Sequence, residues 1–268
     1  MPSSVRAALA AASAAAILTG TSACASARFV PPVGPGEPAP DAAAAWAEAT
    51  RACRGVTSYK GSLRVSGHVG GKRLPTTIGI ATGATATGIR LEGHAAGRSL
   101  FTLAGTSDQA TLYLDDGHRS ATGRPEDLTD ALMGVKLGPG RWLALLTGCV
   151  ATPPDFVEGA RYAADLAVTT SSARVFLSLA NGAWRPADGT FDGLVVTYRR
   201  FASSLPAEWK LRSEAGRDPS IDLVVIVDAV TAGSPLAPSV FTLTLPRDAT
   251  PMTLDELRQG GPLRRKGV

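Results

Sequence analysis

The stretch that decides the fold is GIRLEGHAAGRSLFTLAGTSDQATLYLDDG, from Gly88 to Gly117. Apolar residues recur in it at every second position, and small or polar clusters separate these runs. Ala96-Gly97 and Asp115-Asp116-Gly117 are typical hairpin turns. Because alternation with a period of two indicates strands with one covered face, this stretch predicts antiparallel strands joined by hairpins.

The same alternation extends in both directions from this stretch. Before it, Leu63 and Val65 recur at spacing two, as do Ile78 and Ile80. After it, the clearest candidates are residues 173–179, 193–201 and 220–227, with a final strand at residues 241–245. The sequence therefore predicts a mainly β, α+β domain with an open antiparallel sheet of about 10 strands.

Four segments have helical features instead. Residues 41–54 begin with a candidate N-cap, Asp41, and place Trp46 and Cys53 seven positions apart on one face. Residues 125–133 and 139–148 each begin with proline, and the second ends at glycine. A short helix is expected at residues 251–257. The first three of these helices are the available cover for the concave face of the sheet.

The N-terminus has the features of an export signal. Arg6 precedes a short apolar run at residues 7–18, and small residues follow up to Cys24. We expect cleavage before Cys24 and lipidation of that cysteine; the alternative is ordinary cleavage after Ala27. Residues 24–40 are rich in proline and predict an extended tether that forms neither helix nor sheet. The predicted organisation is a signal peptide at 1–23, a tether at 24–40 and one domain at 41–268.

Charge and cysteine content narrow the possible functions. The formal net charge of +4 is spread along the chain, apart from a basic tail at residues 264–266. That tail is expected to be a solvated end rather than a contact with anionic lipid. No nucleic-acid-binding motif is present. In an oxidising compartment, Cys53 and Cys149 are expected to form a disulfide, and the alternative is two buried thiols.

The sequence lacks the usual signatures of catalysis. His68, His94 and His118 have no metal-ligand spacing, and Asp115 and Asp116 are explained by turn formation. There is no nucleophile elbow, phosphate-binding loop or zinc-protease motif. We therefore expect no enzyme activity, no metal and no cofactor, and an unrecognised hydrolase is the least favoured alternative.

The order of these segments resembles the lipoprotein-sorting family of LolA and LolB. The resemblance is carried by residues 88–93, 100–103, 110–117 and 128–148 in their order, then by residues 206–209 and the strand at 241–245. It covers most of residues 55–250. It implies an incomplete antiparallel β-barrel, here of about 10–11 strands, covered by helices around an apolar cavity that holds the acyl chains of lipoproteins.

The LolB type is itself an outer-membrane lipoprotein, so Cys24 favours that type. The resemblance implies acyl chains of lipoproteins as ligand, a LolA-type carrier as possible partner, and a monomer anchored to the outer membrane and facing the periplasm. It also implies a delivery loop at Ala95, Ala96 and Gly97. In LolB-type proteins this loop carries a bulky apolar residue, and here it carries none.

Alternation along the strands and helices gives a predicted set of cavity-lining residues. They are Leu91, Leu112, Leu114, Leu128, Leu132, Trp142, Leu145, Leu146, Leu177 and Val225. Two alternatives stay open: a sensory lipoprotein that binds acyl chains without passing them on, and a structural envelope lipoprotein whose interior is a dry core.

Overall fold

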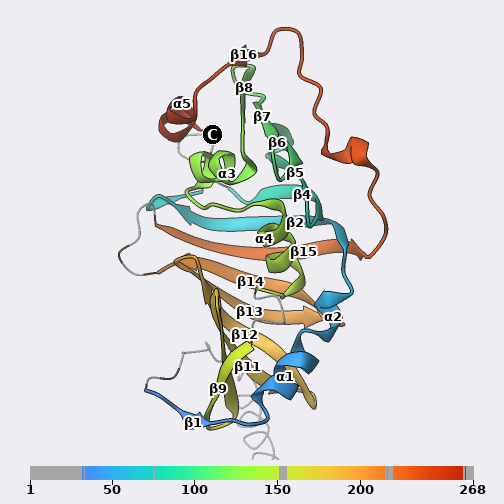
Figure 1. The fold of residues 1–268 in the computed structure, drawn as a ribbon. Helices are drawn as coiled ribbons and strands as arrows, with labels where there is room; N and C mark the ends of the chain where they lie inside the picture. The colour runs from blue at the N-terminus through green and yellow to red at the C-terminus, as the bar shows by residue number, and fades with distance from the viewer. Residues whose placement is uncertain are drawn as a thin grey trace, which may run out of the picture.

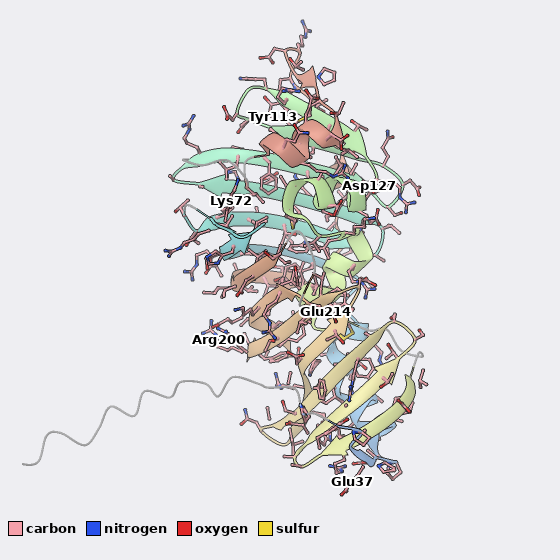
Figure 2. The ribbon with its side chains drawn as sticks, turned by 90° about the vertical axis from the view of Figure 1, so that its left-hand side faces the viewer. Glu37, Lys72, Tyr113, Asp127, Arg200 and Glu214 are labelled. Carbon is pink, nitrogen blue, oxygen red and sulfur yellow. A yellow bond between two sulfur atoms is a disulfide. The ribbon has the colours of Figure 1, made fainter. Side chains whose placement is uncertain are left out.

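The computed structural model describes residues 32, 34–74, 76–150, 156–214, 216, 220–261 and 263. They form one 16-stranded sheet in the order β1-β9-β10-β11-β12-β13-β14-β15-β2-β4-β5-β6-β7-β8-β16, with β3 paired to β2. Figure 1 shows that the sheet is long and twisted, and Figure 2 places Glu37 and Tyr113 toward its opposite ends. The fold is mainly β with an open curved sheet, as the sequence predicts.

The strands are antiparallel except for β16, which pairs in parallel with β8. Their bounds are β1 Glu37–Pro38, β2 Ser58–Val69, β3 Lys72–Arg73, β4 Ile78–Thr85, β5 Gly88–Ala95, β6 Arg98–Thr106, β7 Ala110–Leu114, β8 Arg119–Gly123, β9 Phe156–Tyr162, β10 Asp165–Thr170, β11 Ala173–Ala180, β12 Ala183–Phe191, β13 Leu194–Ala202, β14 Leu205–Ser213, β15 Ile221–Ala232 and β16 Thr250–Pro251.

Two predicted helices cover the half of the sheet that contains β2 and β4–β8. They are α3, Pro125–Met133, and α4, Pro139–Thr147. Both begin with proline, which lacks the N–H that would be unpaired there, and both end at a glycine in the left-handed conformation, Gly134 or Gly148. The predictions for these helices are confirmed.

Helix α4 forms hydrogen bonds to strands on both sides of β15, the middle strand of the sheet. The Trp142 indole Nε1 donates to Thr82 Oγ1 of β4 at 3.0 Å, and the Tyr198 hydroxyl of β13 donates to the Leu145 carbonyl at 3.2 Å. Both hydrogen bonds are buried. Because buried polar groups are costly when unpaired, these two bonds fix the position of α4 over the middle of the sheet.

The other half of the sheet, β9–β13, is covered by the N-terminal helices α1, Ala42–Ala49, and α2, Arg51–Arg54 (Figure 1). Trp46 is 2% exposed and Cys53 is 6% exposed, so both lie on the buried side as the spacing predicts. Cys53 forms a disulfide with Cys149, which follows α4. The bridge therefore connects the helices of the two halves.

The predicted strand count of 10–11 was too low. The missed strands include β9, β10 and β12, whose sequences lack strict alternation; β12 contains Pro186 and Gly189. The pairing of β11 with β12 also shifts register between Phe176 and Leu177. Such a shift moves side chains to the opposite face and breaks the period of two.

The predicted strand at residues 241–245 is wrong. A 3₁₀ helix, η1 at Pro238–Phe241, is followed there by irregular chain. Arg90 Nη1 donates to the carbonyls of Val240 and Thr242, at 3.0 and 3.3 Å. This segment leaves β15 in the middle of the sheet and runs to β16 at its end (Figure 1). The strands that it crosses are already paired on both sides, so none of them has a free edge with which this segment could form a strand pair.

The end of the predicted tether also differs from expectation. Glu37 and Pro38 form β1, which pairs with Arg161 and Ala160 of β9. The Tyr162 hydroxyl donates to the Gly34 carbonyl at 2.8 Å. Proline is tolerated in such an edge strand because its missing N–H can face away from the sheet. The predicted signal peptide and Cys24 lie outside the described residues.

The predicted C-terminal helix is present as α5, Leu254–Gly260, and starts later than expected because of its cap. Thr253 Oγ1 accepts from the Glu256 amide, and the Glu256 carboxylate accepts from the Thr253 amide. Leu257 is fully buried in the core, where α5 packs on α3. In the part of the chain that is described, no helix combines the length and hydropathy needed to cross a bilayer.

Candidate functional site

An apolar cavity of about 40 Å³ lies between the helix-covered face of the sheet and the α3–α4 region. Strands β2, β4, β6, β14 and β15 supply one wall, and residues of α3, α4 and the connection between them supply the other. All lining residues are apolar: Val65, Val69, Leu74, Ile78, Ile80, Phe101, Met133, Leu137, Trp142, Trp209, Leu211, Leu223, Val225 and Leu263.

Local sequence explains how these walls form. On the strands, neighbours such as Ile78 and Ile80, or Leu223 and Val225, are two positions apart and so share a face. On the opposite wall, the Leu137 amide donates to Thr129 Oγ1 at 2.9 Å. This bond closes the connection between α3 and α4 and holds Leu137 over the sheet.

Two tryptophans meet at the cavity. Trp142 of α4 and Trp209 of β14 make an edge contact, with ring centroids 6.3 Å apart. The Trp142 indole is satisfied by Thr82, whereas the buried Trp209 Nε1 has no acceptor among the described residues. Apart from these two indole N–H groups, the lining of the cavity is apolar and contains no ionisable group, which suits an aliphatic ligand.

All ten residues predicted to line a cavity are buried. Trp142 and Val225 border the cavity. The other eight lie in the surrounding packed core and do not border it: Leu91, Leu112, Leu114, Leu128, Leu132, Leu145, Leu146 and Leu177. Sequence reasoning identified burial correctly, but it missed the other twelve residues that line the cavity. Two of them, Leu74 and Leu263, lie outside the alternating strands.

The predicted delivery loop is smaller than expected. Ala95 is 6% exposed and belongs to β5, so the turn consists of Ala96 and Gly97. Their φ angles are 48° and 74°, as required for a two-residue hairpin turn. A turn this short presents a single methyl group to solvent.

The candidate catalytic residues do not come together. Asp115 and Asp116 lie in the β7–β8 turn, and His118 in the same turn is hydrogen-bonded to the Tyr113 hydroxyl at 2.9 Å. No group of three or more His, Cys, Asp or Glu residues that could hold a metal ion occurs within the described ranges.

Asp188 of β12 is the one fully buried carboxylic acid among the described residues. Its carboxylate accepts from the Thr197 hydroxyl at 2.7 Å. Burial raises the pKa of Asp188, and the Thr197 hydrogen bond and the Arg212 charge act in the opposite direction. Its cross-strand neighbours are Phe176 and Thr197, whereas the adjacent Gly189 faces the core, so Asp188 points away from the helix-covered face.

Comparisons with known proteins give distant similarities. No family model matches the chain, and no curated protein matches it in sequence. A LolA superfamily protein from Nitrosomonas europaea is 11% identical, with a TM-score of 0.47 over 74% of this chain and 97% of that one. A putative outer membrane lipoprotein-sorting protein domain from Vibrio parahaemolyticus is 9% identical, with a TM-score of 0.42 over 69% and 88%.

A third solved structure, lipoprotein LppX from Mycobacterium tuberculosis, is 13% identical, with a TM-score of 0.32 over 74% of this chain and 98% of that one. All three similarities lie below 25% identity and below a TM-score of 0.5. A functional proposal for this chain therefore depends on the chain's own residues.

Proposed function

We propose that this protein is a non-catalytic, acyl-chain-binding lipoprotein of the LolB type that takes part in lipoprotein localisation. The observation that carries the proposal is the cavity lined throughout by apolar side chains between sheet and helices. An acyl chain gains about 25 cal/mol for each Å² of apolar surface that it buries, and no charged group of the wall opposes its entry.

Anchoring follows from the N-terminal sequence. In this proposal Cys24 carries lipid, and the domain faces the periplasm from the outer membrane. The combination of one apolar run, small residues and a cysteine supports export and lipidation. A protein with three acyl chains would stay attached to its membrane because each buried methylene adds about 0.8 kcal/mol.

The size of the cavity sets a requirement on this function. Sites for small molecules enclose about 300–1,000 Å³, whereas this cavity encloses about 40 Å³. An acyl chain can therefore enter only if some wall residues move. Residues outside the regular elements, such as Leu74 and Leu263, are the ones that can move without breaking the sheet.

A second candidate function is an envelope lipoprotein that does not deliver cargo. The small cavity volume favours this candidate, as does the Ala96–Gly97 turn, which has no bulky apolar side chain to insert into a membrane. A sensory role would keep lipid binding without transfer, and a structural role would have neither.

A transfer assay separates these candidates. A soluble form that begins at Ala25, and so lacks both the signal segment and the acyl anchor, is mixed with a LolA-type carrier loaded with an acylated lipoprotein, and then with liposomes. Transfer to the protein and onward to liposomes is the expected result. Uptake without release would favour the sensory role, and no uptake would contradict acyl-chain binding.

A further inference from the structure

A second hollow lies on the face of the sheet opposite α3 and α4. It encloses about 560 Å³, which is within the range typical of small-molecule sites, between β2, β4, β5 and the chain that follows β15. Figure 1 shows this last segment, in orange-red, away from α3 and α4. We call the hollow the outer groove; the polar and floor residues that line it include Lys60, Ala81, Arg90, Glu92, Ser239 and Thr242.

Strand register places two positive side chains on opposite sides of the outer groove. Lys60 of β2 pairs with Gly83 of β4, and Gly83 pairs with Arg90 of β5. A neighbour of each of these residues in its strand is buried in the core, so all three positions face away from the helices. Two strand spacings separate Lys60 from Arg90, which corresponds to roughly 10 Å between their Cα atoms. The floor between these two side chains consists of the small residues Gly83 and Ala81.

The chain after β15 forms a fixed roof at one side of the groove. A Cβ added at Gly83 would lie 3.3 Å from Val240 Cγ1, and one added at Gly88 would lie 2.7 Å from the Phe241 ring. Arg90 Nη1 also donates to the Val240 carbonyl at 3.0 Å. Because these contacts hold the roof against the sheet, the groove is formed without a ligand.

Several polar groups in the groove are left with bonding capacity. Arg90 Nε donates to Glu92 Oε1 at 2.6 Å, and both side chains are about one-third exposed. The Lys60 ammonium, the hydroxyls of Ser239 and Thr242 and the second Glu92 oxygen have no protein partner among the residues that the structure describes. One positive charge is therefore uncompensated, and both donors and an acceptor are available to a ligand.

This combination specifies the chemical class of the ligand. A neutral ligand would leave the Lys60 charge without a partner, and an apolar one would also displace water from the hydroxyls and from Glu92 without replacing its hydrogen bonds. An anion with several hydroxyl groups satisfies both requirements. The apolar side chains of Leu236 and Val240, which also line the groove, can contact the C–H face of a ring.

We propose that the outer groove binds an anionic sugar, a hydroxylated ring that carries a carboxylate or a phosphate. Lys60 pairs with the acid group through charge-assisted hydrogen bonds. Glu92, Ser239 and Thr242 exchange hydrogen bonds with the ring hydroxyls. The groove lies on the opposite face of the sheet from the cavity beside Trp142, so this inference does not depend on the proposed acyl-chain binding.

The first test is an NMR titration of the isotope-labelled soluble form that begins at Ala25. The probes are glucuronate, glucose-6-phosphate and neutral glucose. At least one anion should bind about tenfold more tightly than glucose, because only an anion gains a hydrogen bond between charged groups at Lys60. The largest amide shifts should lie in β2, β4, β5 and residues 236–242. If neither anion shifts these amides, or if glucose binds as tightly as both, the proposal is wrong.

The second test uses three variants. Lys60→Gln should lower the affinity for the anion to that of glucose and leave glucose binding unchanged. The matched control is Arg98→Gln, which removes an exposed positive charge from the β5–β6 hairpin and does not border the groove. Ala81→Leu should abolish binding of all three sugars by filling the floor, and the fold should tolerate it because Ala81 is exposed.

Two results with these variants would overturn the site. Unchanged anion affinity in Lys60→Gln would mean that Lys60 does not hold the acid group. An equal loss of affinity in Lys60→Gln and Arg98→Gln would mean that the anion responds only to the total charge of the protein. Amide spectra that match the parent outside the groove establish that each variant is folded.

Discussion

The two halves of the sheet bury their apolar faces in different ways. In the half built from β9–β13, α1 comes close enough that a Cβ added at Gly159 would lie 2.1 Å from the Ala42 side chain, and Trp46 is almost fully buried. In the half built from β2 and β4–β8, α3 and α4 cover the sheet but leave an apolar cavity beside Trp142. Small helix residues permit close contact, whereas large ones hold helix and sheet apart.

The comparison indicates where ligand binding can evolve in such a fold. Helix α1 buries two alanines beside Trp46 and packs closely on the sheet, whereas α4 buries three leucines beside Trp142 and leaves a gap. The position of α4 depends on both halves through Thr82 and Tyr198. Substitutions in either half that move α4 are therefore expected to change the volume of the cavity.

The largest effect is expected from removing the link between the halves. Cys53→Ala with Cys149→Ala should lower the free energy of unfolding by about 4 kcal/mol, because the bridge closes a long loop in the unfolded chain; the cysteines are 96 residues apart. Denaturant unfolding with and without a reducing agent measures this. A reductant effect of similar size on the parent protein, and none on the double variant, is the control.

Two leucines test whether the halves differ in packing. Leu177→Ala, in the filled half, should cost about 3 kcal/mol and leave unchanged the affinity for a fluorescent fatty-acid probe, 11-(dansylamino)undecanoic acid. Leu223→Ala, on the cavity wall, should cost about 2 kcal/mol and strengthen probe binding by enlarging the cavity. Equal effects of the two variants on probe affinity would contradict the distinction between the halves.

The capping box of α5 should have a smaller effect. Thr253→Ala removes the side-chain cap and should cost about 1 kcal/mol. Because α5 packs at the cavity side of the molecule, hydrogen exchange at the amides of α5 should accelerate while that of α1 stays the same. Thr253→Ser is the matched control, since it keeps the hydroxyl that accepts from the Glu256 amide.

The smallest effect is expected from Asp188, which lies on the opposite face of the filled half. Burial raises its pKa above 3.8 in the folded protein, so the folded state holds this proton more tightly than the unfolded state. Its contribution to stability is therefore present at low pH and is lost as the pH rises through the folded pKa. Asp188→Asn should reduce this loss, measured as the difference in stability between pH 4 and pH 7. If the variant loses more stability than the parent between pH 4 and pH 7, the predicted direction of the Asp188 contribution is wrong.

The parts of the fold that the sequence predicts well are those with local signals. Pro125, Pro139, Gly134 and Gly148 bound α3 and α4 through their own backbone preferences, so no distant residue is needed to place these helix ends. For the missed β12, two local signals were available: Asn181-Gly182 and Asp192-Gly193 have left-handed turn conformations and flank that strand.

Other parts could not be predicted because they depend on distant contacts. Alternation at residues 241–245 indicates one covered side, but it does not say whether a neighbouring strand has a free edge. Burial of Leu145 and Val225 follows from periodicity, yet only Val225 borders the cavity. Which buried residue faces a gap depends on how α3, α4 and the chain end around Leu263 fit the sheet.

The pairing of β1 with β9 has a consequence for the reach of the domain. It fixes the entry of the tether at the end of the sheet, seven strands away from β15 in the sheet order, which corresponds to roughly 34 Å along the sheet. Between Cys24 and Glu37 the chain can span roughly 40 Å when extended. With lipid on Cys24, as proposed, the span of the extended chain would exceed the distance from β1 to β15, so the anchor would not prevent the cavity beside β15 from reaching the bilayer.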